Sequence, residues 1–175
     1  MLSKLFSSKK RIRVLEYVLY KDSVRVTEVS TKLNLSKGFI SEFLSILFKN
    51  KILYKKDGYH PTNSSLTRAI KILININKIK ITKIKKPFIK GIGLFGSWAN
   101  GTNMDNSDLD IYIKTDEYPD EKELAILSKK LREMSDSDVQ LLVLTPNKIR
   151  QIKKDKPFYS NLVNNSIVLW GKHID

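Results

Sequence analysis

The segment from Ile89 to Lys114 constrains the fold of this chain most, because it places a glycine-serine turn and a polar loop between two strand-like runs. The first run, Ile89 to Phe95, and the second, Leu109 to Lys114, have the length and the apolar, β-branched content of strands. The Gly-Ser pair directly follows the first run. We therefore expect two neighbouring strands connected by a short helical turn and a loop.

Two aspartates stand at and inside the second predicted strand. Asp108 and Asp110 are separated by one residue, so their side chains are expected on one face of the strand. An unpaired carboxylate is costly in an apolar run such as LDIYI, whereas carboxylates and phosphates together bind Mg²⁺ well. The alternative is a polar loop whose aspartates only form turns. That interpretation suits Asp105, Asn106 and Ser107 better.

The Gly-Ser turn supplies what a triphosphate needs beside such a metal site. Gly96 lets the backbone turn tightly, and Ser97 offers a hydroxyl and an amide at the start of a short helix. One or two Mg²⁺ ions on the aspartates would stabilise the attacking and leaving oxygens of an in-line displacement. The segment therefore predicts a site that binds Mg²⁺ together with a nucleoside triphosphate.

The spacing of Gly96-Ser97, ten residues and Asp108-x-Asp110 resembles the minimal nucleotidyltransferases of the DNA polymerase β-like superfamily. The similarity extends to Ala99, Gly101 and Ser107. It implies ATP as substrate, Mg²⁺ on the two aspartates, and nucleotide contacts from Gly96, Ser97 and Ser107.

Two positions depart from the family's pattern. Asn100 stands where the family usually has Arg or Lys. The family's third carboxylate lies on a later strand, here SDVQLLVLT, where alignment of the apolar residues puts Gln140 at the acidic position. Asp138, two residues earlier on the same face, is our candidate for the third catalytic and metal-binding acid. The alternative is that Asp138 is a loop residue and the site is weakened.

The charge of the chain is concentrated in its first half. Residues 1–90 carry 21 Lys and Arg against 5 Asp and Glu, whereas residues 91–175 carry 11 against 13. A lysine-rich genome would raise both halves, so the asymmetry favours a polyanionic partner for the first half.

The first half has an order of elements that resembles a winged helix-turn-helix domain, over roughly residues 8–62. We expect a helix over 10–20, a short strand at VRV, a helix capped by Thr27, a helix capped by Ser36, and a hairpin turning at Asp57-Gly58. The resemblance implies binding of double-stranded DNA. The candidate contacts are Ser36, Lys37, Ser41, Lys55 and Lys56. Many winged helices are instead protein-docking modules.

The predicted fold class is α/β (α+β), with two domains. Residues 1–65 form the winged helix-turn-helix, and residues 66–175 form a small nucleotidyltransferase domain with a mixed sheet and flanking helices. A linking helix over about 64–80 is expected to bury one apolar face. That face comprises Ala69, Ile72, Leu73, Ile76 and Ile79.

The composition of the chain excludes two kinds of cysteine site and argues against a membrane span. The chain has no cysteine, so a disulfide framework and a thiolate metal site are excluded. No apolar run reaches the length of a membrane span, and we expect a soluble cytoplasmic protein without a membrane partner.

Two classes of function fit these patterns. One is an Mg²⁺-dependent transferase of AMP, for which the resemblance implies a protein acceptor such as a HEPN-type toxin in a toxin–antitoxin pair. The other is a DNA-binding transcriptional regulator whose nucleotidyltransferase domain only binds nucleotide or is inactive. A third hypothesis combines both activities. Winged-helix regulators are often homodimers, although no interface signature is visible in the sequence.

Overall fold

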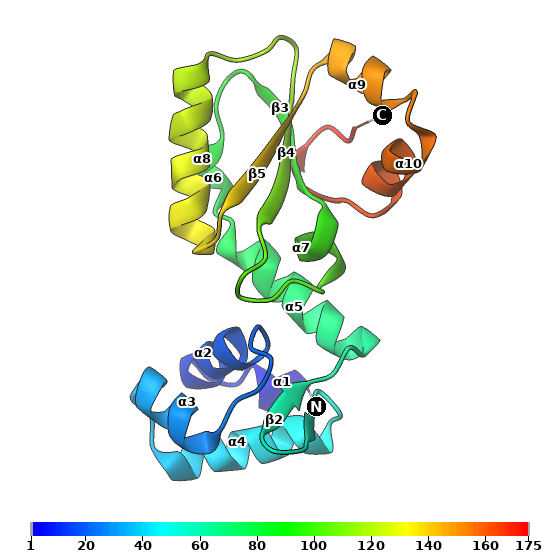
Figure 1. Cartoon of the computed structure of the whole chain (residues 1–175). Coiled ribbons are helices and arrows are strands. Elements are labelled where there is room, and N and C mark those ends of the chain that lie inside the picture. The colour runs from blue at the N-terminus through cyan, green and yellow to red at the C-terminus, as the bar shows by residue number, and fades with distance from the viewer. Residues whose placement is uncertain (1, 175) are drawn as a thin grey trace. The chain divides into compact units, whose positions relative to one another are not determined.

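The computed structural model describes residues 2–174, and the chain divides into two compact units (Figure 1). The first unit ends at Lys71 and the second begins at Ile72. This division lies inside helix α5 (Ser65–Lys78), whereas the predicted boundary after residue 65 lies at the start of the same helix.

The first unit consists of helices and one hairpin. Its helices are α1 (Leu2–Leu5), α2 (Lys9–Val18), α3 (Val26–Leu33) and α4 (Lys37–Lys49), followed by strands β1 (Leu53–Lys55) and β2 (Tyr59–Pro61). The strands pair antiparallel around the Asp57-Gly58 turn. The expected strand at VRV is reduced to one bridge between Val24 and Tyr59. Apolar residues from α2 and α4 fill the core: Val14, Leu15, Val18, Ile40, Phe43, Leu44 and Leu47.

Serine caps begin two of these helices. Ser8 Oγ accepts a hydrogen bond from the Arg11 amide, and Ser36 Oγ accepts one from the Phe39 amide, each at 3.3 Å. The predicted cap at Thr27 is wrong, because α3 already begins at Val26. At that end the Glu28 carboxylate reaches back to accept a hydrogen bond from the Arg25 amide at 3.3 Å.

A four-stranded mixed sheet forms the centre of the second unit. Its order is β5 (Val139–Leu144), β4 (Leu109–Thr115), β3 (Ile89–Leu94) and β6 (Ile167–Gly171). Strand β3 pairs antiparallel with both of its neighbours, whereas β4 and β5 run parallel. The sheet and its flanking helices match the predicted architecture of this part of the chain.

Helices cover both faces of this sheet. Helices α6 (Ile81–Ile84) and α8 (Glu121–Ser135) pack on one face through a core that includes Ile84, Leu127 and Leu131. Helices α9 (Pro146–Ile152) and α10 (Lys156–Asn164) lie on the other side, where Tyr112, Ile149 and Leu162 share a second core (Figure 1). Within residues 2–174, no helix combines the length and the apolar character that crossing a membrane requires.

The apolar face predicted for α5 is largely wrong. Leu73 and Ile76 are 54% and 37% exposed, and Ala69 is exposed as well, although Ile79 is buried. The buried side carries Ile70 and Ile74 together with three polar residues, Thr67, Lys71 and Asn75. Hydrogen bonds explain part of this choice, because Thr67 Oγ1 bonds Thr62 Oγ1 at 2.8 Å and Asn75 bonds Trp98 O at 2.8 Å.

Candidate active site

The two aspartates lie at the end of β4 that adjoins the start of α7 (Gly96–Asn100). The Phe95 amide donates to the Asp110 carbonyl oxygen at 3.1 Å, which fixes the entry to α7 against β4. The Leu109 amide donates to the Asp138 carbonyl oxygen at 2.7 Å and so aligns β4 with β5. These backbone bonds bring the Gly-Ser turn and the two aspartates together.

Gly96 is required by its backbone conformation and by its contact with Asp110. Its φ is +61°, in the left-handed region. A Cβ at this position would overlap Oδ2 of Asp110. The next amide, that of Ser97, donates a hydrogen bond to the Asp110 carboxylate. The turn therefore packs directly on a metal-ligand candidate.

The environment of Asp110 raises the pKa of its carboxyl above the ordinary value. The main cause is partial burial, and the second is the negative charge of Asp108; the hydrogen bond from Ser97 opposes both. A cation beside the two carboxylates would remove this penalty. Two carboxylates completed by substrate phosphates and water are a ligand set that suits Mg²⁺. Asp108 and Asp110 thus fit the predicted metal.

Gln140 is the third polar side chain at this site. Its backbone is paired directly with Asp110 in the parallel register of β4 and β5. Its side-chain Nε2 donates to Oδ2 of Asp108 at 2.7 Å. The position that the alignment assigned to an acid therefore holds a neutral hydrogen-bond donor, which steadies Asp108 without adding negative charge.

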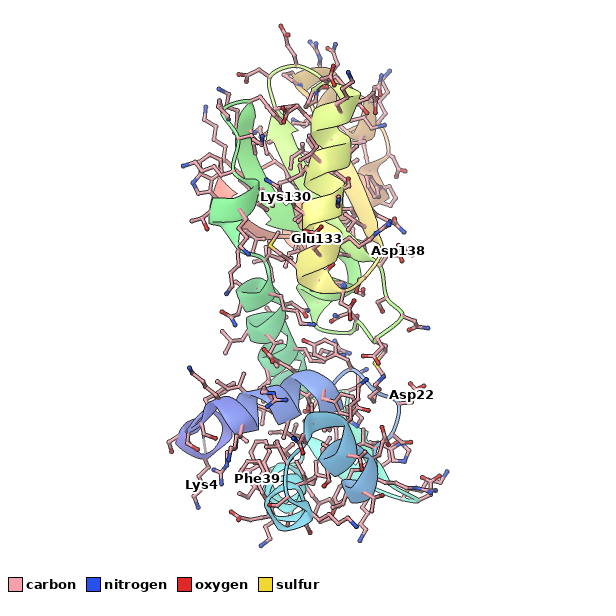
Figure 2. The ribbon with its side chains drawn as sticks, turned by 90° about the vertical axis from the view of Figure 1, so that its left-hand side faces the viewer. Lys4, Asp22, Phe39, Lys130, Glu133 and Asp138 are labelled. Carbon is pink, nitrogen blue, oxygen red and sulfur yellow. The ribbon has the colours of Figure 1, made fainter. Side chains whose placement is uncertain are left out.

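Asp138 is not gathered with the other two acids. Its carboxylate is 76% exposed and forms an ion pair with Arg132 of α8 at 3.0 Å. Figure 2 shows Asp138 between the end of α8 and the start of β5. Among residues 2–174, no group of three His, Cys, Asp or Glu side chains is arranged to hold one metal ion. The geometry gives no support to the metal role predicted for Asp138.

The other predicted nucleotide contact, Ser107, closes a turn. Its Oγ accepts a hydrogen bond from the Met104 amide at 2.8 Å, and its own amide donates to Met104 O at 3.0 Å. Asn100 is exposed at the end of α7, whereas Trp98 is buried in the core. The hydroxyl of Ser107 is therefore already used in shaping the loop that leads to Asp108.

Two buried asparagines behind this site were not identified from the sequence. Asn75 of α5 donates through Nδ2 to Trp98 O at 2.8 Å and to Asn103 Oδ1 at 3.0 Å. Asn103 Nδ2 donates back to Asn75 Oδ1 at 3.4 Å. The only sequence signal was an asparagine between isoleucines in a helix, which does not reveal its partner.

In the first unit, the candidate DNA contacts lie on α4 and the hairpin. Lys37, Ser41, Lys55 and Lys56 are exposed. Ser36 is also exposed, but its hydroxyl oxygen caps α4. The ammonium of Lys55 lies 5.9 Å from the centre of the Tyr59 ring.

Comparisons with known proteins agree with this description of the second unit. The family described as "Polymerase beta, Nucleotidyltransferase" matches residues 77–174. A search of curated proteins found no match.

Several solved structures are similar to part of the chain. A complex of MNT antitoxin with tri-AMPylated HEPN toxin from Shewanella oneidensis is 27% identical, covering 58% of this chain and 73% of that chain, with a TM-score of 0.40. An MntA–HepT toxin–antitoxin structure is 29% identical over 57% and 73% of the two chains, with a TM-score of 0.40. A toxin–antitoxin with AMP-PNP is 28% identical over 62% and 75%, with a TM-score of 0.39.

Proposed function

This chain belongs to the polymerase β nucleotidyltransferase family, and we propose that it transfers AMP from ATP, in the presence of Mg²⁺, to a hydroxyl group of a protein acceptor. One observation carries the proposal. Asp108 and Asp110 lie at one end of β4, and the Gly96 turn packs on the Asp110 carboxylate. A metal-bound triphosphate needs carboxylates and an unobstructed backbone at the same place.

In the proposed reaction, the acceptor oxygen forms a bond to the α-phosphorus of ATP while the bond from that phosphorus to the bridging oxygen breaks. Pyrophosphate leaves, and the hydroxyl proton passes to solvent. Mg²⁺, when bound, would supply positive charge that neutralises the phosphates. Asp108 and Asp110 would hold the ion, and Gln140 orients Asp108. The Gln140 amide cannot accept the proton, so it is not a general base.

The proposed acceptor class follows from the resemblance carried by the Gly-Ser and Asp-x-Asp residues. Minimal nucleotidyltransferases of this kind include antitoxins that adenylylate a tyrosine of a HEPN ribonuclease toxin. We therefore propose a HEPN-type toxin encoded beside this chain as the first acceptor to test.

The experiment incubates the pure protein with ATP labelled at the α-phosphate, Mg²⁺ and the product of the neighbouring gene. We expect label on the acceptor, and loss of it in Asp108→Asn and Asp110→Asn. Asp116→Asn is the matched control, because Asp116 follows the other end of β4 and only pairs with Lys90 at 3.3 Å. Binding of ATP without transfer to any acceptor would overturn the proposal in favour of a nucleotide-sensing role.

As a second function, we propose that the first unit binds double-stranded DNA as a winged helix. The excess of basic residues in the first half supports it, as do the exposed Lys37, Lys55 and Lys56 on α4 and the hairpin. Lysines that neutralise phosphates release counterions, so affinity must fall with salt.

The DNA proposal is tested on the full chain. Replacing Lys55 and Lys56 by Gln should reduce the slope of log affinity against log salt by about 2. The matched control replaces Lys122 and Lys129, two exposed lysines of α8, by Gln. The same slope in both double variants, or no binding of duplex by the parent protein at low salt, would count decisively against DNA binding.

A further inference from the structure

A pair of buried amides connects α5 with the segment that carries the Gly-Ser turn. Asn75 and Asn103 are 0% and 1% exposed. They form reciprocal hydrogen bonds with each other, and Asn75 Nδ2 makes a further bond of 2.8 Å to the carbonyl oxygen of Trp98. Both residues belong to the second unit, so the network lies within one compact body.

The partners of this pair lie on both sides of the bend between the Gly-Ser turn and the aspartates. Trp98 directly follows Ser97, whose amide bonds the Asp110 carboxylate. Asn103 begins the part of the loop that leads to Asp108. One residue of α5 therefore fixes α7 and this loop together.

Stability alone does not account for two amides at this place. Burying polar groups is costly unless they are bonded, and an apolar pair would fill the same space without that cost. A satisfied buried network instead selects one arrangement of the segments that it joins. The segments joined here are those that hold Ser97 and Asp108.

We propose that Asn75 and Asn103 are positioning residues for nucleotidyl transfer. They act through Trp98 and the loop, and neither touches the reacting atoms. Asn75 has the larger role, because its amide donates to the Trp98 carbonyl oxygen. This inference rests on the proposed transferase function and concerns the same site.

Two matched substitutions distinguish a role in positioning the site from a role in packing alone. Asn75→Asp and Asn103→Asp each place a carboxyl group in the same buried space. Asn103→Asp leaves an acceptor for Asn75 Nδ2 and leaves the bond to Trp98 O intact, whereas Asn75→Asp removes the amide that donates to Trp98 O. Asn77→Asp, at an exposed position of α5, is the surface control.

We expect Asn75→Asp to lower kcat about tenfold or more, with the KM for ATP changed less than about threefold. Asn103→Asp should lower kcat by less than about threefold, because the bond to Trp98 persists. Both variants should have similarly lowered Tm, and Asn77→Asp should match the parent. Equal losses of kcat in the two buried variants, or parental kcat in Asn75→Asp, would overturn the proposal.

If the parent protein transfers no nucleotide, the proposed transferase function is overturned but the positioning role is not. Hydrogen exchange can then still test the positioning role. In the full chain, Asn75→Asp should speed exchange of the Ala99 and Thr102 amides, which bond Phe95 O and Ser97 O. We expect their exchange rates to rise about tenfold. Exchange of the amides that pair β3 with β4 should change little, and Asn103→Asp should have a smaller effect on all of these rates. Unchanged protection at these two amides would refute the positioning role.

Discussion

The side-chain amide of Gln140 donates a hydrogen bond of 2.7 Å to Oδ2 of Asp108, while the backbone of Gln140 is paired with Asp110. The third polar position of the site thus contacts one acid and lies beside the other. Burial and, second, the charge of Asp108 already raise the pKa of Asp110, and a third carboxylate here would have added further repulsion. The amide instead leaves a site with two negative charges, so we expect it to bind Mg²⁺ more weakly and to depend more on the phosphates of the nucleotide.

Replacing Gln140 by Glu should therefore strengthen the metal site. We expect the Mg²⁺ concentration needed for half-maximal ATP binding to fall about three- to tenfold, because a third carboxylate joins the ligands. The metal-free variant should be less stable than the parent, since three like charges then meet. Gln140→Leu is the control for loss of the hydrogen bond alone. Magnesium titrations followed by nucleotide binding give the comparison, and an unchanged midpoint in Gln140→Glu contradicts this interpretation of the site.

Gly96→Ala tests the contact between the turn and Asp110. The new Cβ would overlap the Asp110 carboxylate, and the residue would have to keep a positive φ. We expect a loss of about 1–3 kcal/mol in the free energy of unfolding. Mg²⁺-dependent activity should fall about tenfold or more, because the carboxylate is displaced.

Gly38→Ala is the control for that substitution. Gly38 lies in the first turn of α4 and has ordinary backbone angles, and apart from its chain neighbours and the backbone of its own helix no atom lies within 4 Å of an added Cβ. Alanine there should be neutral or stabilising by up to about 1 kcal/mol. Urea unfolding of both variants measures the difference, and similar stabilities for the two would mean that the turn tolerates a side chain.

The secondary structure around the candidate site was predictable, because the strand pattern is local. Alternation of apolar residues placed Asp108 directly before β4 and Asp110 inside it, and the Gly-Ser pair fell at the start of α7 as expected. The partners of these residues were harder to predict. Whether Asp138 pairs with Arg132, and whether Gln140 reaches Asp108, depends on how β5 and α8 pack after folding.

Helix α5 shows why its own apolar face was predicted wrongly. Isoleucines occur at every second position from residue 70 to 76, a pattern that does not select one face of a helix. The buried face was selected by polar partners elsewhere in the chain, such as Asn103 for Asn75. A single sequence contains those residues but does not show that they meet.

Asp110→Asn should stabilise the metal-free protein at neutral pH while abolishing transfer. The folded-state pKa of this carboxyl lies above its ordinary value, so the folded protein binds the proton more tightly than the unfolded chain does. Stability from this group is present at low pH and is lost as the pH rises through the folded pKa. The advantage of Asn in Tm should therefore shrink as the pH is lowered. Saturating Mg²⁺ should raise the Tm of the parent and leave that of Asp110→Asn unchanged.

Lys71 should make the stability of the first unit rise with pH. Burial lowers the pKa of its ammonium from 10.5 to about 8, although the ammonium lies 5.1 Å from the centre of the Tyr20 ring. Between about pH 8 and the ordinary value the unfolded chain binds more protons than the folded one, so the free energy of unfolding increases with pH. Below that window the amine is charged in both the folded and the unfolded chain. The full cost of burying the charge then lowers the free energy of unfolding by an amount that no longer changes with pH.

Lys71→Met should remove this cost, stabilising the protein at pH 7 by about 1–3 kcal/mol and flattening the dependence on pH. Urea unfolding at pH 7 and 9.5 measures both effects. The range stops there because burial also raises the pKa of the Tyr20 hydroxyl, which makes stability fall once the unfolded tyrosine ionises. Lys32→Met, at an exposed position of α3, is the control and should leave the slope unchanged. Parallel pH profiles for Lys71→Met and the parent would show that the amine is solvated in the folded state.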